Sequence, residues 1–583
     1  MGTISDKLIR IINTKEDIRQ ALISKGYDVP TSIPFKEYAK MILDLPCNAD
    51  SFPDIEGIVA RYSASGITNE QMAANPVWVD KTGNGRDLQL KNFSWKGMSG
   101  VGGYVGDFSK WVNNRDTTEI GITKSNSKVI IDVKVSQGSG KNIVFISKSN
   151  LGISNNVTIK ITSTYPEGVM KFANSASNKY LKLPSNGIIT LQDNPEYTSN
   201  EMHLHLASAD LGQITIEQLP LYPGALVFDG VDDYGTCDNF PVLTKEKGYT
   251  VVALRQWIEE KNDSTALVSN CKNWGQNGAF LFEYNNLRIN FLNVAISFGY
   301  VSSVDRGKSP FSYQTSKLYN GKNIEPGSLI GSNELIVGKG NKDFPTFSKA
   351  AIWELVFLDH DATEEELTKI KDYFVKTYPW LFPDQAWTVT GKTNEDEDRA
   401  TIANITGNGN DLILSNFGFI EGSGYNEEGE CAGYLVTDGM DDYVRSSNDF
   451  TLGKKFTVVG EWELLDNTTV LSGIAKNVDF FLYSNINGLS FYCKQGNLPT
   501  VFNGIKSLTA FNSEGLAYDH KWEKYVCEKT GDEAPKTTRF IIGTNNNTFA
   551  KVAFKNMAMY AEKVLSKEDM IKAYIYLQTL KSK

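Results

Sequence analysis

Two short acidic segments contain the residue types most suited to binding a metal ion. Residues 228–234 read FDGVDDY and residues 437–443 read TDGMDDY, so each has adjacent aspartates shortly after a glycine. Carboxylate oxygens are the hard ligands that calcium prefers, which makes Asp232 and Asp441 candidate calcium ligands. Adjacent residues of one strand point to opposite faces, so the paired aspartates need ligands from other loops to hold a single ion.

The same two segments also fit a purely structural role. Glycine turns the chain easily, and a short acidic side chain accepts hydrogen bonds from exposed main-chain N–H groups. On this interpretation Gly230 and Gly439 form the turns, the aspartates cap the backbone, and Tyr234 and Tyr443 pack beyond them. We favour the structural interpretation, and a calcium ion in either segment is the alternative.

A second candidate metal site is the segment MHLHL, which places His203 and His205 two residues apart. Alternation along a strand puts both imidazoles on one face, where they can share one metal ion. The simpler interpretation, which we favour, is a pair of surface residues on a strand. The chain has four histidines in all, too few to indicate a serine–histidine–aspartate triad.

An internal repeat positions the two acidic segments. TGNGRDLQLKNF from Thr82 matches TGNGNDLILSNF from Thr406, and YTVVALRQWIE matches FTVVGEWELL. AAIWELVFLDHDATEEELTKI in the first copy then matches KVAFKNMAMYAEKVLSKEDMI in the second. Thr82 and Asp229 are 147 residues apart, whereas Thr406 and Asp438 are 32 apart, so the first copy carries about 115 extra residues. An insertion of that length predicts a separate domain.

Each copy of the repeat predicts short strands followed by one closing helix. Runs such as YTVVAL, FLFEY and LIVG are β-branched or aromatic and are bounded by turn-forming residues. Thr363 and Ser566 are suitable N-caps, because carboxylates occupy the first turn after each of them. The apolar face of the first helix contains Leu367, Ile370, Phe374 and Val375.

Carboxylates placed for glycoside hydrolysis are scarce. That reaction needs two carboxylates about 5–10 Å apart across a cleft. Glu461 and Glu463 share one face of a predicted strand, but the matching segment ALRQWIE has no acidic residue at those positions. The run NEDED, with Glu395 to Asp398, is typical of a solvated loop.

A nucleotide-binding loop is not indicated either. Residues 136–142, SQGSGKN, lack the first glycine and the final Ser or Thr of a P-loop. We therefore expect no enzyme and no catalytic residues.

The order of TGNGRDL, FDGVDDY, YTVVAL and IWELVFLDHDATEEELTKI resembles the concanavalin A-like, or laminin-G-like, jelly-roll family. The resemblance implies one jelly-roll β-sandwich over residues 51–104 and 219–378, and a second over 379–583. Residues 105–218 alternate in KVIIDVKVS and VTIKITST, which predicts a smaller inserted β-sandwich. The family includes glycan binders, hydrolases and structural modules, so it implies a fold and no particular ligand.

Residues 1–50 predict a short helical segment for attachment or oligomerisation. Thr14 with Asp17 is a capping-type start, and Gly26 and Pro30 form a stop. The apolar stripe is too short for a stable helix in water, so it either packs on its own protein or docks on a partner. The segment NTKEDIRQALISKGYDVPTSIPFKEYAKMI resembles segments near the N-termini of tailed-phage virion proteins, often fibres.

The segment MHLHL carries a second resemblance to phage proteins. Some trimeric phage fibre tips hold iron through His-x-His pairs, which this segment resembles.

Composition excludes several classes of protein. The chain has 583 residues and a formal net charge of −10, whereas nucleic-acid binders need a cationic face. No apolar stretch approaches the roughly 18 residues of a membrane span, and the first residues do not form a secretory signal peptide. The six cysteines show no CxxC spacing and are expected to be free thiols of a protein made in a reducing cytoplasm.

These observations together predict a virion protein of a tailed phage. We expect a head- or tail-fibre subunit made in the bacterial cytoplasm, with lectin-like domains that attach to host-surface or mucus glycans. The expected partners are further copies of the chain, as a homotrimer or a dimer, and other virion proteins bound through residues 1–50. We expect no nucleic acid, no membrane insertion and no cofactor apart from the calcium alternative. A structural decoration protein and a polysaccharide-degrading tailspike are the competing functions.

Overall fold

The computed structural model describes most of the chain after residue 51. From residues 1–50 it describes Lys15, Ile18 and Arg19, all helical, so the N-terminal helical prediction otherwise lies outside the described residues. No described helix is long and apolar enough to cross a membrane. The other described ranges are 52–113, 118–135, 143–147, 157–165, 170–174, 180–182, 184–191, 202–206, 211–243, 247–259, 265–271, 278–283, 309–323, 332–340, 346–428, 431–465, 472–477, 480–485, 488–493, 500–503, 508–526, 539–545 and 548–582.

The first sandwich consists of two antiparallel sheets. Its larger sheet has the order β22-β21-β20-β17-β24-β15-β4, and β1 also pairs with β24. These strands are β1 (Ile58–Ser63), β4 (Gly100–Val101), β15 (Leu226–Asp229), β17 (Thr250–Glu259), β20 (Phe311–Thr315), β21 (Leu318–Tyr319), β22 (Lys322–Asn323) and β24 (Lys349–Leu358). The facing sheet has the order β19-β18-β23-β16-β3-β2. Its strands are β2 (Val77–Trp78), β3 (Leu88–Lys91), β16 (Tyr234–Cys237), β18 (Val268–Cys271), β19 (Gly278–Phe282) and β23 (Leu335–Val337).

The second sandwich repeats this strand order. Its larger sheet runs β28-β29-β42-β31-β36-β37-β38, with β25 also on β42, and its facing sheet runs β26-β27-β30-β39-β32-β33-β34-β35. The larger sheet contains β25 (Gln385–Thr388), β28 (Gly424–Tyr425), β29 (Leu435–Val436), β31 (Phe456–Leu464), β36 (Ala510–Asn512), β37 (Leu516–Tyr518), β38 (Lys524–Val526) and β42 (Val552–Ala561). The facing sheet contains β26 (Thr401–Ile402), β27 (Leu412–Ser415), β30 (Tyr443–Ser446), β32 (Ser472–Asn477), β33 (Phe480–Asn485), β34 (Gly488–Cys493), β35 (Thr500–Asn503) and β39 (Ile541–Ile542). A hairpin of β40 (Thr544–Asn545) and β41 (Thr548–Phe549) follows β39.

A third, smaller sandwich lies between β4 and β15 of the first. Its sheets have the orders β11-β10-β13-β8-β5 and β12-β9-β14-β7-β6. The strands are β5 (Val112–Asn113), β6 (Ile120–Lys124), β7 (Lys128–Val133), β8 (Ile143–Ser147), β9 (Val157–Ser163), β10 (Met170–Asn174), β11 (Tyr180–Lys182), β12 (Asn186–Leu191), β13 (Met202–Leu206) and β14 (Gly212–Gln218). The predicted fold class is therefore confirmed, because the chain is mainly β and is built from antiparallel β-sandwiches.

Helices close the two larger sandwiches as the capping signals predict. In the part of the chain described after residue 51, the helices are α3 (Asn69–Ala74), α4 (Glu364–Thr377) and α5 (Lys567–Gln578), with 3-10 turns at η1 (Phe108–Lys110) and η2 (Pro379–Leu381). Thr363 accepts a hydrogen bond from the N–H of Glu366 in a capping box, and Ser566 accepts one from Asp569. Leu367, Ile370 and Phe374 of α4 are buried.

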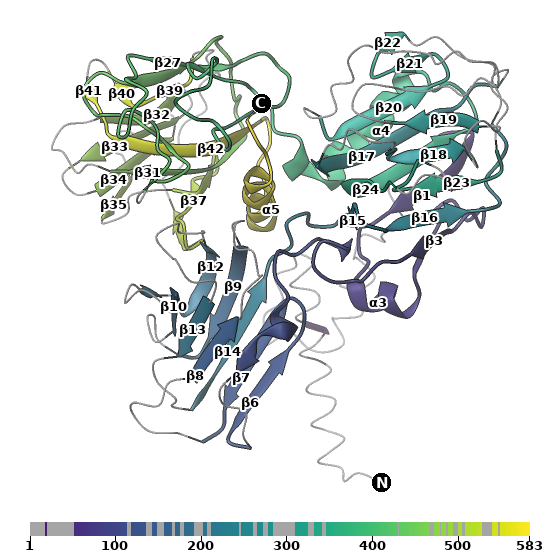
Figure 1. Cartoon of the computed structure of the whole chain (residues 1–583). Coiled ribbons are helices and arrows are strands. Elements are labelled where there is room, and N and C mark those ends of the chain that lie inside the picture. The colour runs from purple at the N-terminus through teal and green to yellow at the C-terminus, as the bar shows by residue number, and fades with distance from the viewer. Residues whose placement is uncertain are drawn as a thin grey trace.

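One apolar cluster joins the three sandwiches. It combines the outer faces of both larger sheets with α4, α5 and Ile188 of the inserted sandwich. Figure 1 shows α5 near the place where the three sandwiches approach one another. Polar contacts cross the same junction: Thr190 donates to the Tyr574 hydroxyl at 3.3 Å, and Gln256 donates to Thr579 at 3.0 Å. The sandwiches are therefore packed against each other through α5.

Candidate functional site at the two acidic turns

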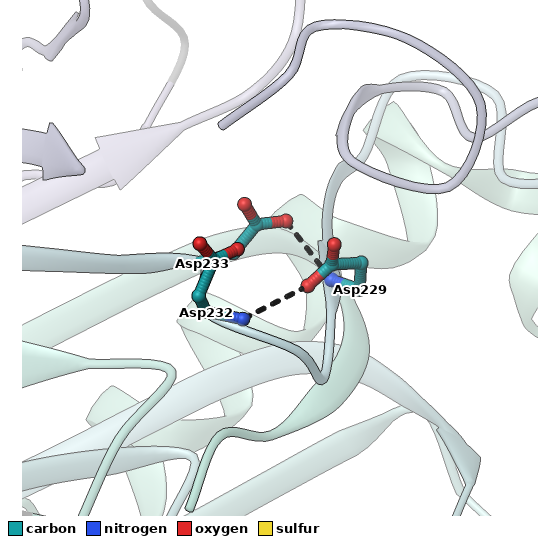
Figure 2. A group of neighbouring side chains, drawn as sticks. All are labelled: Asp229, Asp232 and Asp233. Carbon is teal, nitrogen blue, oxygen red and sulfur yellow. Dashed lines mark hydrogen bonds between the residues drawn. The ribbon is translucent and has the colours of Figure 1, made fainter. Parts of the chain in front are cut away.

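The first acidic turn, residues 229–233, links β15 to β16 (Figure 2). Gly230 has φ of +76°, a conformation that glycine adopts without strain. The Asp229 carboxylate accepts hydrogen bonds from the N–H groups of Val231 at 2.7 Å and Asp232 at 3.4 Å. The Asp233 carboxylate points back and accepts from the N–H of Asp229 at 3.0 Å. Two of the three carboxylates thus cap the turn.

The second acidic turn, residues 438–442, has the same hydrogen bonds. Asp438 accepts from the N–H groups of Met440 at 2.7 Å and Asp441 at 3.2 Å, and Asp442 accepts from Asp438 at 2.9 Å. Gly439 has φ of +79°. The backbone-capping interpretation of these segments therefore holds in both copies.

Carboxylate oxygens of the three aspartates approach within 4.8 Å of one another in each turn. This spacing is compatible with a hard cation, and Asp232 and Asp441 are the exposed members of the two groups. In each of the remaining carboxylates, one oxygen already accepts hydrogen bonds from main-chain N–H groups. A calcium ion at Asp232 or Asp441 stays a prediction.

Asp233 is a fully buried carboxyl group. Its relative exposure is 0%, and its second oxygen accepts a hydrogen bond from the Ser99 hydroxyl at 3.0 Å. Burial raises the pKa of Asp233 to about 7, and the nearby charges of Asp229 and Asp232 act in the same direction. Burial likewise raises the pKa of Asp442 above its usual value.

Replacing Asp233 with asparagine is expected to reduce the pH dependence of stability. The folded-state pKa lies above the unfolded value of 3.8, so the carboxyl group costs stability progressively as the pH rises from about 4 to about 7. Asparagine is neutral throughout and keeps an oxygen for the N–H of Asp229. At pH 8 the variant should be more stable than the natural chain by up to about 4 kcal/mol.

Urea unfolding at pH 4, 6 and 8 measures this effect. Asp232→Asn is the matched control, because the same substitution on the exposed neighbour removes only the smallest of the causes that shift the pKa of Asp233 and should flatten the pH profile far less. An Asp233→Asn profile as steep as that of the natural chain would contradict the assignment.

Half-exposed aromatic rings flank the first turn. The rings of Tyr234, at the start of β16, and Phe347 have centroids 6.0 Å apart. The Lys339 ammonium lies 5.4 Å from the centroid of Tyr234 and 4.9 Å from that of Phe347. Exposed Asn92 donates its side-chain amide to the Asp232 carbonyl at 3.0 Å. We call Tyr234 and Phe347 the first aromatic flank.

The second turn has an equivalent surface. Tyr443 begins β30, Phe549 ends β41, and both are half-exposed. Phe549 pairs with Thr544 as Phe347 pairs with Lys339, which makes the two phenylalanines equivalent. Asn416 donates to the Asp441 carbonyl at 3.0 Å, as Asn92 does in the first copy. Tyr443 and Phe549 form the second aromatic flank.

These surfaces suit carbohydrate chemistry. Aromatic rings present apolar faces for stacking, and carboxylate and amide groups orient a polar ligand through hydrogen bonds. Sequence reasoning assigned Tyr234 and Tyr443 to packing and named no sugar-binding residue. The available signal was the Thr-Phe pair shared by PTFSKAAIW and NTFAKVAFK, which precedes the last long strand of each copy.

The other predicted candidates do not join these surfaces. The backbone of His203 and His205 lies on β13, opposite β8 and β10, and their side chains lie outside the described part. Glu461 lies near α5, where it accepts from Gln578 at 2.7 Å and pairs with Lys555 at 3.3 Å. Residues 395–398 form a solvated turn, and 136–142 are not described.

Of the comparisons with known proteins, the one with solved structures gives matches. No protein-family model and no curated protein matches the chain. Trypanosoma rangeli sialidase matches at 10% identity and a TM-score of 0.23, over 78% of this chain and 62% of its own. The binding domain of botulinum neurotoxin serotype D matches at 8% identity and a TM-score of 0.22, over 59% of this chain and 88% of its own. Likeness this low carries no functional inference.

Proposed function

We propose that the chain is a carbohydrate-binding attachment protein with one ligand surface on each larger sandwich. The observation that carries this proposal is the duplication of the surface. Both copies keep a half-exposed tyrosine and a half-exposed phenylalanine at equivalent positions, together with an exposed aspartate and an exposed asparagine. The surface residues have thus been retained in both copies, whereas a buried ion pair of the core has not.

A buried ion pair in the core of the first sandwich is absent from the second sandwich. Buried Arg61 on β1 pairs with Glu354 on β24 at 3.0 Å. The strand registers place Ala386 and Asn556 at these two positions in the second sandwich. The core has therefore changed its chemistry between the copies, while the acidic turns and aromatic flanks have kept theirs.

The proposed mechanism is multivalent attachment through sites of modest affinity. Two surfaces held on one packed scaffold convert the second binding event into an intramolecular one, which can raise avidity by about 10²–10⁴. The continuous apolar cluster under α4 and α5 supports a fixed spacing between the two surfaces. A repeating surface polysaccharide is the kind of ligand that such spacing favours.

We place this activity in a tailed-phage virion, as a head- or tail-fibre subunit that oligomerises and binds other virion proteins through residues 1–50. This placement rests on the resemblance of the N-terminal segment. Attachment without catalysis is the form that we propose, because the hydrolase candidate Glu461 has a side chain that is 11% exposed and ion-paired.

A glycan array probed with the full chain tests the proposal. Binding is expected for the natural chain and for Tyr234→Phe/Tyr443→Phe, which keeps both rings. Tyr234→Ala/Tyr443→Ala should lose it, because the stacking faces are removed. If the natural chain binds no bacterial or host glycan on the array, a structural decoration role is favoured. If it releases reducing sugar from a bound polysaccharide, a hydrolase is favoured.

A further inference from the structure

The inserted sandwich meets the second sandwich at the hairpin of β37 and β38. The N–H of Ile188, on β12, donates to the Lys521 carbonyl at 3.4 Å. A side chain at Gly187 would place its Cβ 2.9 Å from the same carbonyl, so the two backbones approach closely. Trp522 packs edge-on against Tyr574 of α5 with centroids 6.0 Å apart. Three parts of the fold thus converge on this hairpin.

Each of these three parts contributes a lysine. Lys160, on β9, is the cross-strand partner of Ile188 and therefore shares its outward face. Lys524, on β38, is the cross-strand partner of Tyr518. Lys567 begins α5, and its ammonium lies 5.2 Å from the Tyr518 ring centroid. We call Lys160, Lys524 and Lys567 the lysine cluster.

The position of the Lys567 ammonium is fixed by a hydrogen bond. It donates to the Trp522 carbonyl at 3.1 Å. Burial lowers the pKa of Lys567, the positive charges of Lys160 and Lys524 lower it further, and the weaker effect of the Asp519 carboxylate opposes them. Lys567 thus experiences the positive charge of both other lysines, and an anion bound beside its ammonium group would reduce that repulsion.

The carboxylates around the lysine cluster already have other partners. Asp519 accepts from the N–H groups of Lys521 at 2.9 Å and Glu523 at 2.8 Å. Glu568 pairs with Lys572 at 2.8 Å, and Glu217 lies 3.8 Å from Lys128. Among the described residues, no carboxylate makes an ion pair with a member of the lysine cluster.

We propose that Lys160, Lys524 and Lys567 form a binding site for an oxyanion, such as a sulfate, a phosphate or the carboxylate of an acidic sugar. Ammonium groups hold such anions through charge-assisted hydrogen bonds. The site is separate from the aromatic flanks and does not depend on the proposed carbohydrate binding there. It concentrates positive charge within a chain whose net charge is −10.

An anion bound at this site would also link two of the sandwiches and stabilise the folded chain. An anion held by Lys160 on one side and by Lys524 and Lys567 on the other bridges the inserted sandwich to the second sandwich. A ligand that binds the folded chain stabilises it in proportion to the logarithm of its concentration above the dissociation constant. Oxyanion binding should therefore raise the unfolding temperature.

Calorimetric titration of the full chain with sodium sulfate, at constant ionic strength, tests the site. The natural chain should bind sulfate saturably, and each of Lys160→Ala and Lys524→Ala should weaken binding about tenfold through loss of one charge-assisted hydrogen bond. Lys322→Ala, on exposed β22, is the matched control and should bind like the natural chain. At millimolar sulfate, the unfolding temperature should rise most for the natural chain and Lys322→Ala, and less for Lys160→Ala and Lys524→Ala.

The outcomes separate this site from the carbohydrate sites. Tyr234→Ala/Tyr443→Ala should bind sulfate normally even if it loses glycans. Repeating the titration with glucuronate and with polyglucuronate distinguishes a free anion from an acidic glycan as the ligand. Equal sulfate affinity in Lys160→Ala/Lys524→Ala and the natural chain would overturn the proposal, as would an absence of saturable binding to the natural chain.

Discussion

Replacing Glu283 with alanine is expected to lower the free energy of unfolding of the first sandwich by about 3–5 kcal/mol. Glu283 is fully buried at the end of β19, and it binds Arg255 of β17, which is 2% exposed. The closest contact between the pair is 2.6 Å, and the hydroxyl of Tyr319 also donates to Glu283 at 3.2 Å. Removal of the carboxylate leaves a guanidinium buried without its counter-charge, which is the main reason for the loss.

Denaturant unfolding followed by hydrogen exchange at β17 measures this loss. Glu283→Ala/Arg255→Leu should recover most of it, because an apolar pair replaces a broken ion pair. The second sandwich offers a precedent: the shared β-bulge makes Trp462 the equivalent of Arg255, so this core position accepts an apolar residue. A loss below about 1 kcal/mol in the single variant would contradict the account.

The pair also predicts sensitivity to acid. Burial alone would raise the pKa of Glu283, but the charge and hydrogen bonds of Arg255 outweigh burial and hold it below its usual value of 4.5. A lowered folded-state pKa stabilises the protein above pH 4.5, and this stabilisation is lost as the pH falls further.

Replacing Trp522 with alanine is expected to cost about 3–5 kcal/mol and to release the inserted sandwich from the second one. The indole is 3% exposed and lies between Tyr518, at a centroid distance of 5.8 Å, and Tyr574. Its removal leaves a cavity at the junction of three sandwiches. Limited proteolysis should then cut the insert faster than in the natural chain.

Trp522→Phe is the matched control, because it keeps an aromatic ring against Tyr574. It should lose less stability than Trp522→Ala and resist proteolysis more. Unchanged proteolysis in Trp522→Ala would mean that the insert is held by other contacts.

The sequence was sufficient to predict the sandwich architecture because the repeat supplied its own alignment. TGNG and DDY mark the same turns in both copies, and their unequal spacing revealed the inserted residues. Alternation and capping signals are local, so Thr363 and Ser566 could be recognised from a few neighbours.

The candidate sites required the folded structure because they combine residues that are distant in the chain. Phe347 lies 113 residues after Tyr234, and the ring pair exists only once β16 and the segment before β24 are adjacent. The lysine cluster likewise combines residues of β9, β38 and α5, which are distant in the chain. No local periodicity encodes such proximity.

The number of carbohydrate sites per chain is the most direct test of the account. Isothermal titration of the full chain, with the smallest oligosaccharide that it binds, should give two sites. Tyr234→Ala and Tyr443→Ala should each retain one site, and the double variant should retain none. A single site in the natural chain, or two sites that survive in the double variant, would contradict the duplicated aromatic flanks as the ligand surfaces.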